Sequence, residues 1–265
     1  MAQSIMTRLP DSEFLHRLAD LADRETLPRF RRPLVVDAKS DPGQEFDPVT
    51  EADRRAEIVM RELIGTEYPA HAIFGEEFGS SGAGPMQWVI DPIDGTKPYL
   101  CGIPVWGTLI GLVDGGLATL GMMSQPVTSE RFWADPSGAW HRSPTGTRRL
   151  AVRRLTDLSQ AILHTTSPDQ FPIEGRAAFA SLRSSVRMTR YGGECYAFAM
   201  LAAGCIDICV EPNLKPYDII PIIPIVEKAG GVVTRFDGRR AETGGAILLS
   251  ATPELHEKVL AILNG

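Results

Sequence analysis

The spacing of hydrophobic residues near the start of the chain predicts two amphipathic helices. Over residues 11–30, apolar side chains recur every three or four positions, as on the buried face of a helix: Phe14, Leu15, Leu18, Leu21 and Ala22. Asp11 or Ser12 offers the side-chain oxygen that commonly caps such a helix. The same periodicity returns over residues 51–64, and Thr50 stands where its cap is expected.

Shorter apolar runs between these helices and the middle of the chain predict strands. The runs cover residues 72–74, 88–90, 105–113, 117–123, 131–134 and 139–141. Asp114-Gly115-Gly116 and the segment 135–138 have the composition of tight turns, so each joins its flanking runs as a hairpin. We therefore expect the first half to place two helices on a largely antiparallel sheet.

The second half of the chain alternates between strand-like and helix-like patterns. Strands are expected at residues 150–152, 161–164, 206–210, 232–236 and 246–249, and helices at 174–184, 195–203, after Asp218 and at 253–263. Such alternation favours α/β packing. The polar segment 143–149 is the best boundary, which divides the chain into residues 1–145 and 146–265.

Charge and composition exclude some classes of protein. The 265 residues have a formal net charge of −6, whereas a protein that binds a nucleic-acid backbone needs a basic surface. The only basic cluster, Arg148, Arg149, Arg153 and Arg154, is typical of a solvated strand face or edge. Hydrophobic residues make up 43% of the chain, enough for a sizeable core.

Location is expected to be cytoplasmic. No apolar run approaches the length of a membrane span, and the first ten residues lack the apolar stretch of a signal peptide. The four cysteines form no Cys-x-x-Cys pair and have no histidine at zinc-site spacing. We expect reduced, mostly buried thiols, with an oxidative Cys205–Cys209 pair as the less favoured alternative.

The strongest chemical signal is Asp91-Pro92-Ile93-Asp94-Gly95-Thr96, which directly follows the predicted strand 88–90. Hard divalent cations prefer oxygen ligands, and one tight turn here offers two carboxylates and the Ile93 carbonyl. Gly95 lets the backbone approach a ligand closely, and the N–H groups of Gly95 and Thr96 would face a phosphate if they open a helix. The competing interpretation is an ordinary polar turn, because Asp-Pro and Asp-Gly are common turn sequences.

Three further segments give this motif a family context: Gly75-Glu76-Glu77, residues 48–53 ending in Asp53, and Tyr217-Asp218. Together with this motif, and in their order along the chain, they resemble the inositol monophosphatase superfamily of Mg²⁺-dependent phosphomonoesterases, over nearly the whole chain. The resemblance implies a five-layer αβαβα sandwich, mixed α/β (α+β) in class, with the site between the two halves. It also implies a homodimer.

The metal ligands follow from the same resemblance. It implies that Glu76, Asp91, Asp94 and Asp218, with the carbonyl of Ile93, hold two or three Mg²⁺ ions, and Mn²⁺ is an alternative. Paired cations can neutralise a phosphate monoester, which otherwise repels its nucleophile.

The resemblance also implies catalytic roles for individual residues. The resemblance implies that the Thr96 hydroxyl, held by Asp53, orients the attacking water, and that Glu76 assists as base. Asp53 alternatively serves only as a first-turn carboxylate that the helix dipole favours. Lys39 matches a family lysine near the metal loop, and residues 37–47 are a candidate lid.

Substrate choice is expected in the second half. Glu211 stands seven residues before Asp218, the offset of the family's substrate-contacting glutamate. Glu194 replaces the small or hydroxyl residue usual in inositol phosphatases, and an extra carboxylate beside a phosphate site needs a cation to meet it. Glu194 alternatively faces a helix dipole or pairs with Arg190. Lys97 either contacts phosphate or braces the loop.

The acidic pocket suggests a phosphate monoester with an ammonium group, such as L-histidinol phosphate. Lys97-Pro98-Tyr99, residues 104–110 and 214–218 are similar to the histidinol-phosphatase branch of the superfamily. Alternatives are an inositol-1-monophosphatase or a broad-specificity sugar or nucleotide phosphatase, although a nucleotide or bisphosphate enzyme should carry more basic residues. A non-catalytic phosphate-binding homologue is a more distant alternative, because every metal and catalytic residue of the pattern is present.

Overall fold

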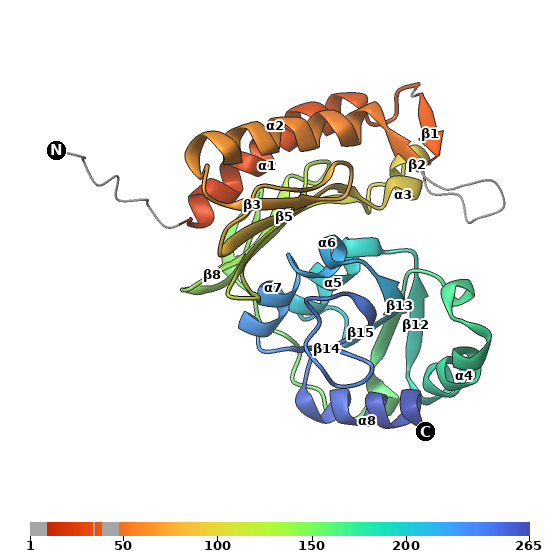
Figure 1. The fold of residues 1–265 in the computed structure, drawn as a ribbon. Helices are drawn as coiled ribbons and strands as arrows, with labels where there is room; N and C mark the ends of the chain where they lie inside the picture. Colours follow the sequence, from red (N-terminus) through yellow and green to blue (C-terminus); the bar gives the residue numbers. More distant parts are fainter. Residues whose placement is uncertain (1–9, 34, 39–47) are drawn as a thin grey trace.

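The computed structural model describes residues 10–33, 35–38 and 48–265. Five layers are stacked in the order helices, sheet, helices, sheet, helices (Figure 1). This arrangement confirms the predicted αβαβα sandwich of mixed α/β class.

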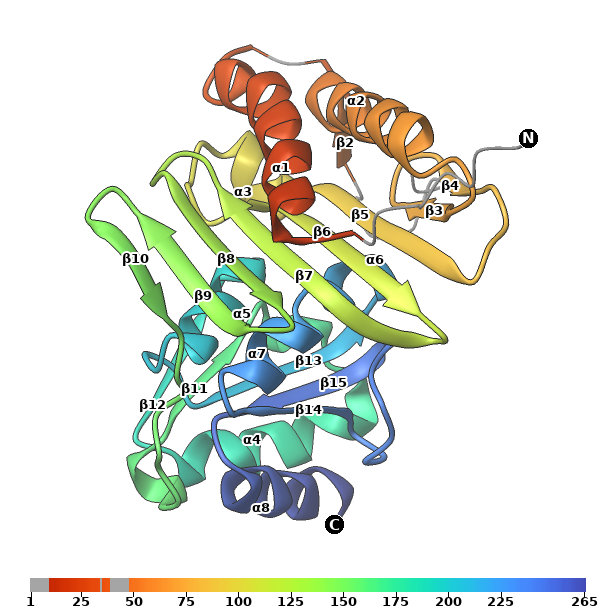
Figure 2. The same ribbon diagram turned by 90° about the vertical axis from the view of Figure 1, so that its left-hand side faces the viewer.

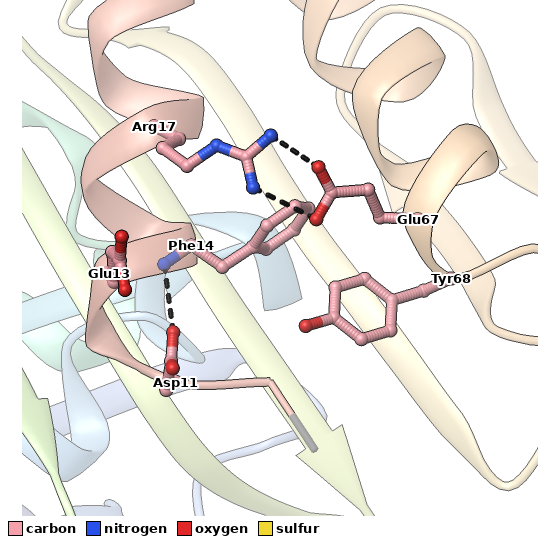
Figure 3. Close-up of a pocket in the computed structure, with 6 residues that line it drawn as sticks. All are labelled: Asp11, Glu13, Phe14, Arg17, Glu67 and Tyr68. Atoms are coloured by element: carbon pink, nitrogen blue, oxygen red, sulfur yellow. Dashed lines mark hydrogen bonds and ion pairs between the residues drawn. The ribbon is translucent and has the colours of Figure 1, made fainter. Parts of the chain in front are cut away.

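The first layer consists of α1 (Ser12–Thr26) and α2 (Glu51–Glu67). Asp11 caps α1 by accepting the amide N–H of Phe14 at 3.0 Å, and Thr50 and Asp53 form a capping box on α2. Both helices were predicted, but α1 ends four residues early, and the short 3-10 helix η1 (Leu27–Arg29), which contains Pro28, follows it. An ion pair between Arg17 and Glu67 joins α1 to the end of α2 (Figure 3).

The second layer is an eight-stranded sheet in the order β10-β9-β8-β7-β6-β5-β3-β4. Its strands are β3 (Ala72–Gly75), β4 (Gly79–Ser81), β5 (Met86–Asp94), β6 (Gly107–Asp114), β7 (Leu117–Gln125), β8 (Glu130–Asp135), β9 (Gly138–Ser143) and β10 (Gly146–Arg149). Only β3 and β5 run parallel, so the sheet is largely antiparallel as predicted. The side chains of Phe14, Met60, Ile64, Trp88 and Ile110 fill the core under α1 and α2.

Two assignments near this sheet differ from the sequence analysis. The strand expected at 150–152 is absent, because the chain pairs with β9 over 146–149 instead and then leaves the sheet. The sheet therefore extends four residues beyond the proposed boundary at residue 145, and the division into two halves stays a prediction. A small sheet that was not predicted joins β1 (Val36–Ala38) to β2 (Pro48–Thr50). Residues 37 and 38 of the candidate lid therefore lie in a strand, and the other residues of the lid, 39–47, lie outside the described residues.

The middle layer consists of α5 (Glu194–Ala202), α6 (Pro216–Ile219) and α7 (Ile223–Lys228), packed between the sheets (Figure 2). The helix expected after Asp218 begins two residues before it and is interrupted at 220–222. Gly121 of β7 allows this interruption to touch the sheet, because a Cβ there would lie 1.9 Å from the carbonyl oxygen of Pro221.

The remaining two layers are a five-stranded sheet and its outer helices. The sheet order is β12-β11-β13-β15-β14, made of β11 (Ile162–Thr165), β12 (Met188–Tyr191), β13 (Ile208–Leu214), β14 (Val232–Arg235) and β15 (Gly245–Ser250). Outside it lie α4 (Arg176–Ser185) and α8 (Pro253–Asn264). Three short 3-10 helices complete the half: η2 (Leu158–Gln160), η3 (Pro168–Gln170) and η4 (Ile173–Gly175).

Two surface properties bear on the earlier expectations. None of the helices in the described ranges is long and apolar enough to cross a membrane. All four cysteines are free, but Cys101 and Cys205 are exposed, so the expectation of mostly buried thiols holds for only Cys195 and Cys209.

Candidate active site

The Asp-Pro-Ile-Asp-Gly-Thr motif lies at the carboxyl end of β5, as the apolar run before it predicted. Asp91 and Asp94 both pair with β6, opposite Leu109 and Gly107, and the register shifts between them, so the two carboxylates flank an irregularity in the ladder. The chain then turns at Gly95, whose φ is 87°, and the short helix α3 (Thr96–Leu100) begins. A residue with a side chain would be strained here, because a Cβ would also lie 3.0 Å from Cγ of Glu194.

Folding brings Asp218 to this motif from the other half of the chain. Its carboxylate accepts the amide N–H of Lys215 at 2.7 Å within α6, which fixes its orientation. One ligand atom each from Asp91, Asp94 and Asp218 lies within 4.8 Å of the others. Glu76 lies at the end of β3, where its amide N–H donates to Ile90 at 3.1 Å, and it lines the same cavity of about 190 Å³.

Burial and mutual repulsion disfavour the charged forms of these carboxylates. Burial, and then the charges of Glu76, Asp94 and Asp218, raise the pKa of Asp91 well above its usual range. Burial and then the charge of Asp94 raise the pKa of Asp218, and burial raises the pKa of Asp94. A divalent cation would remove this penalty, and clustered carboxylate oxygens are the donors that a hard cation prefers, so the residues fit the predicted metal.

Thr96 lies next to this cluster and contacts Asp53 of α2. Its hydroxyl donates to the carbonyl of Ile93 at 3.1 Å and lies 3.5 Å from Oδ1 of Asp53. Oδ2 of Asp53 accepts the amide N–H of Thr50 at 2.9 Å and also its hydroxyl. Burial, against these hydrogen bonds, raises the pKa of Asp53 to about 6. Asp53 therefore occupies both positions considered from sequence, a first-turn carboxylate and a partner of Thr96.

Glu194 enters the same cavity from α5. It is the first residue of that helix and has a φ of 46°, an uncommon conformation for a residue with a side chain. Burial and the charge of Asp94 raise its pKa to about 7, while the charge of Lys97 lowers it. Lys97, which also lines the cavity, is thus the cation that acts on Glu194, rather than the Arg190 considered from sequence.

Glu211 lies deeper than the sequence suggested. On β13 it is 1% exposed and is not among the described residues that line the cavity. Its Oε1 accepts the amide N–H of Thr166 at 2.7 Å and the hydroxyl at 3.1 Å. Burial raises the pKa of Glu211 to about 8. Thr166, which does line the cavity, therefore stands between Glu211 and the cavity.

Sequence reasoning missed three residues that line the cavity: Pro98, Thr166 and Gln170. Thr166 had a usable signal, because it directly follows β11, and ligands often lie at the carboxyl ends of parallel strands. Lys39, the remaining predicted substrate residue, lies outside the described residues.

A second cavity, of about 170 Å³, lies between the start of α1 and the end of α2 (Figure 3). Its charged groups have structural partners, since Asp11 caps α1 and Glu67 pairs with Arg17. The acidic cluster beside Gly95, and not this cavity, therefore carries the candidate chemistry.

Comparison with known proteins identifies the family of the chain. Residues 11–265 match the sequence model of the inositol monophosphatase family. The histidinol-phosphatase of Streptomyces coelicolor is 38% identical over 263 residues, which cover 97% of each chain. That of Mycobacterium tuberculosis is 35% identical over 251 residues, 93% of this chain and 95% of the relative. A solved inositol monophosphatase from Zymomonas mobilis superposes with a TM-score of 0.84 at 36% identity, over 96% of this chain and 97% of the other.

Proposed function

The chain belongs to the inositol monophosphatase family of metal-dependent phosphatases, and from this premise we propose that it is a Mg²⁺-dependent histidinol-phosphatase. The reaction converts L-histidinol phosphate and water to L-histidinol and phosphate, a step of histidine biosynthesis. The curated relatives that carry this name extend over almost the whole chain, which supports the proposal.

One observation about the cavity carries the choice of substrate. Glu194 lies in it as a fifth acidic group, beside Glu76 and the cluster of Asp91, Asp94 and Asp218. The cluster has the donors for metal and phosphate. Burial and the charge of Asp94 outweigh the charge of Lys97 at Glu194, so a cation of the substrate would stabilise the charged form of Glu194. L-Histidinol phosphate has a phosphate at one end and an ammonium group at the other, so it suits both groups. Glu211 then acts indirectly, by holding Thr166 at the cavity wall.

The metal would be held by Asp91, Asp94 and Asp218, with Glu76 and the carbonyl of Ile93. We propose two or three Mg²⁺ ions, which Mn²⁺ can replace. When bound, the ions supply positive charge that stabilises the phosphoryl group and favours deprotonation of water.

The chain's own groups then prepare the reaction. The Thr96 hydroxyl, next to Asp53, orients the attacking water, and Glu76 assists in removing its proton. The N–H groups of Gly95 and Thr96 at the start of α3 donate to the phosphate, and Lys97 adds positive charge at the cavity wall. Lys39 lies outside the described residues, and its contact with substrate stays a prediction.

Inositol phosphate is the second candidate substrate, because the solved Zymomonas mobilis protein is an inositol monophosphatase at 36% identity. Cytoplasmic location, a homodimer and the lack of a nucleic-acid partner stay predictions.

The test is phosphate release from L-histidinol phosphate and inositol 1-phosphate, measured in parallel with and without Mg²⁺. We expect a Mg²⁺-dependent preference for histidinol phosphate in kcat/KM of at least about tenfold, or about 1.4 kcal/mol in transition-state binding. A preference for inositol phosphate would retain the metal site and reject the ammonium-binding role of Glu194.

A further inference from the structure

A buried glutamate in α2 contacts the turn that carries Glu76. Glu57 is completely buried, although its neighbours on the outer face of the helix are solvated. Its Oε2 accepts the amide N–H of Glu77 at 2.7 Å, and its Oε1 accepts that of Phe78 at 3.1 Å. These two amides belong to the turn between β3 and β4, which lies under α2 (Figure 2).

The charge of Glu57 has a partner on the same helix. Arg61, one turn later, donates through Nε to Oε1 of Glu57 at 2.7 Å. The other end of the Arg61 guanidinium donates to Ser81 Oγ at 2.8 Å and to the carbonyl of Gly79. A buried carboxylate is tolerated when its oxygens are hydrogen-bonded in this way. The Glu57–Arg61 pair therefore connects α2 to the turn and to the strand β4 that follows it.

The glycine before Glu76 is required by this contact. A Cβ on Gly75 would lie 2.0 Å from Oε1 of Glu57, a distance no side chain accepts. The Gly75 position and the Glu57 carboxylate are therefore complementary, and together they set where the chain leaves β3. On the opposite side, the Glu76 amide is bound to Ile90 of β5 at 3.1 Å.

We propose that Glu57 is a positioning residue that holds Glu76 in the orientation needed to bind metal. The inference rests on the proposed function, in which Glu76 is a metal ligand. Asp53 and Glu57 stand one helical turn apart on α2, so a single helix braces both Thr96 and the Glu76 turn. Groups that fix the orientation of a metal ligand typically contribute about 10- to 100-fold to metal affinity. Glu57 would do so through the two amides that follow Glu76.

The test compares Glu57→Gln with Glu62→Gln, which makes the same charge change on an exposed position of the same helix. Mg²⁺ binding is measured by calorimetry on the chelator-treated protein, and activity is measured across Mg²⁺ concentrations. We expect Glu57→Gln to weaken Mg²⁺ binding about 10- to 100-fold and to recover most of its kcat at saturating Mg²⁺. Glu62→Gln should match the wild type in both.

Hydrogen exchange of the metal-free protein gives a readout that does not depend on activity. The Glu77 and Phe78 amides should exchange slowly in the wild type and rapidly in Glu57→Gln, while those in the middle of α2 stay protected in both. Wild-type Mg²⁺ affinity in Glu57→Gln, or rapid exchange of both amides in the wild type, would overturn the proposal. Because rapid exchange of these two amides in the wild type would by itself overturn the proposal, the test holds even if Glu57→Gln fails to fold.

A third variant separates this proposal from the proposed function. If Glu76→Gln leaves Mg²⁺ binding unchanged, Glu76 is not a metal ligand, and the metal assignment fails together with the role given to Glu57. If Glu76→Gln weakens Mg²⁺ binding and Glu57→Gln does not, only the positioning role is rejected.

Discussion

At the scale of single residues, Asp94 links the two halves of the site. Its Oδ2 accepts the amide N–H of Cys195, in the first turn of α5, at 2.7 Å, although the two residues are 101 positions apart. The same carboxylate belongs to the acidic cluster with Asp91 and Asp218. Asp94 therefore combines a structural contact with the proposed metal contact.

We predict that Asp94→Asn lowers kcat/KM by more than about 100-fold, since even partners outside the ligand set cost 10- to 100-fold. The fold should persist, because asparagine retains an oxygen for the Cys195 N–H and relieves repulsion in the metal-free cluster. Phosphate release and thermal unfolding check both parts, with Asp114→Asn at the exposed end of β6 as control. A near-normal rate would remove Asp94 from the metal set.

A second residue-scale prediction concerns Glu194→Gln. A hydrogen bond to a charged group contributes about 1.5–3 kcal/mol, so we expect a loss of about 10- to 100-fold in kcat/KM for L-histidinol phosphate. Phosphate esters without an amine should lose much less, and Glu257→Gln at an exposed position of α8 should have no effect. Kinetics on histidinol phosphate and inositol 1-phosphate decide the matter, and an equal loss on both would reject the ammonium contact.

At the scale of elements, the site depends on how β5 ends and α3 begins. The left-handed turn at Gly95 reverses the chain so that Thr96 faces Asp53 and Glu194 packs against the turn. Helices α1 and α2 were predictable because caps and apolar spacing agree. The β1–β2 pair was not, because three-residue strands have too few positions to show a period.

Gly95→Ala should destabilise the protein more than Gly116→Ala, whose φ of 84° is almost the same as the 87° of Gly95. The left-handed conformation costs a residue with a side chain about 1–2 kcal/mol at either position. Only at Gly95 does the new Cβ meet other atoms, Cγ of Glu194 at 3.0 Å and Cα of Trp106 at 3.3 Å. Denaturant unfolding of both variants measures the difference in the free energy of unfolding. Equal losses of stability would show that the Gly95 turn accommodates a Cβ without a steric clash.

At the scale of the whole molecule, the fold concentrates negative charge between its two sheets. Burial raises the pKa of Glu194 to about 7 and that of Glu211 to about 8. Each carboxyl binds its proton more tightly in the folded protein than in the unfolded chain. The folded state is therefore favoured at low pH and loses this advantage as the pH rises through the folded pKa.

We predict a pH-dependent difference in stability between the metal-free wild type and Glu211→Gln. From pH 6.5 to 8.5, titration of Glu211 should lower the wild-type free energy of unfolding relative to the variant by about 2 kcal/mol. His16, His164 and His256, whose pKa values burial lowers to about 4, change stability in the opposite direction, but equally in both proteins. Urea unfolding across this range is the measurement, and a constant difference would exclude a protonated Glu211.

The sequence by itself determined the residue types of the metal cluster, both helices that open the fold, most strands and the family. These features are local, because a helix cap, the spacing of apolar residues and the Asp-Pro-Ile-Asp-Gly-Thr motif can each be identified within a short segment of the chain. Only the tertiary structure decided that Thr166 stands between Glu211 and the cavity, that Lys97 acts on Glu194, and that Glu57 holds the Glu76 turn. These contacts join segments 20 to 97 positions apart, and their geometry depends on how the two sheets and α2 pack.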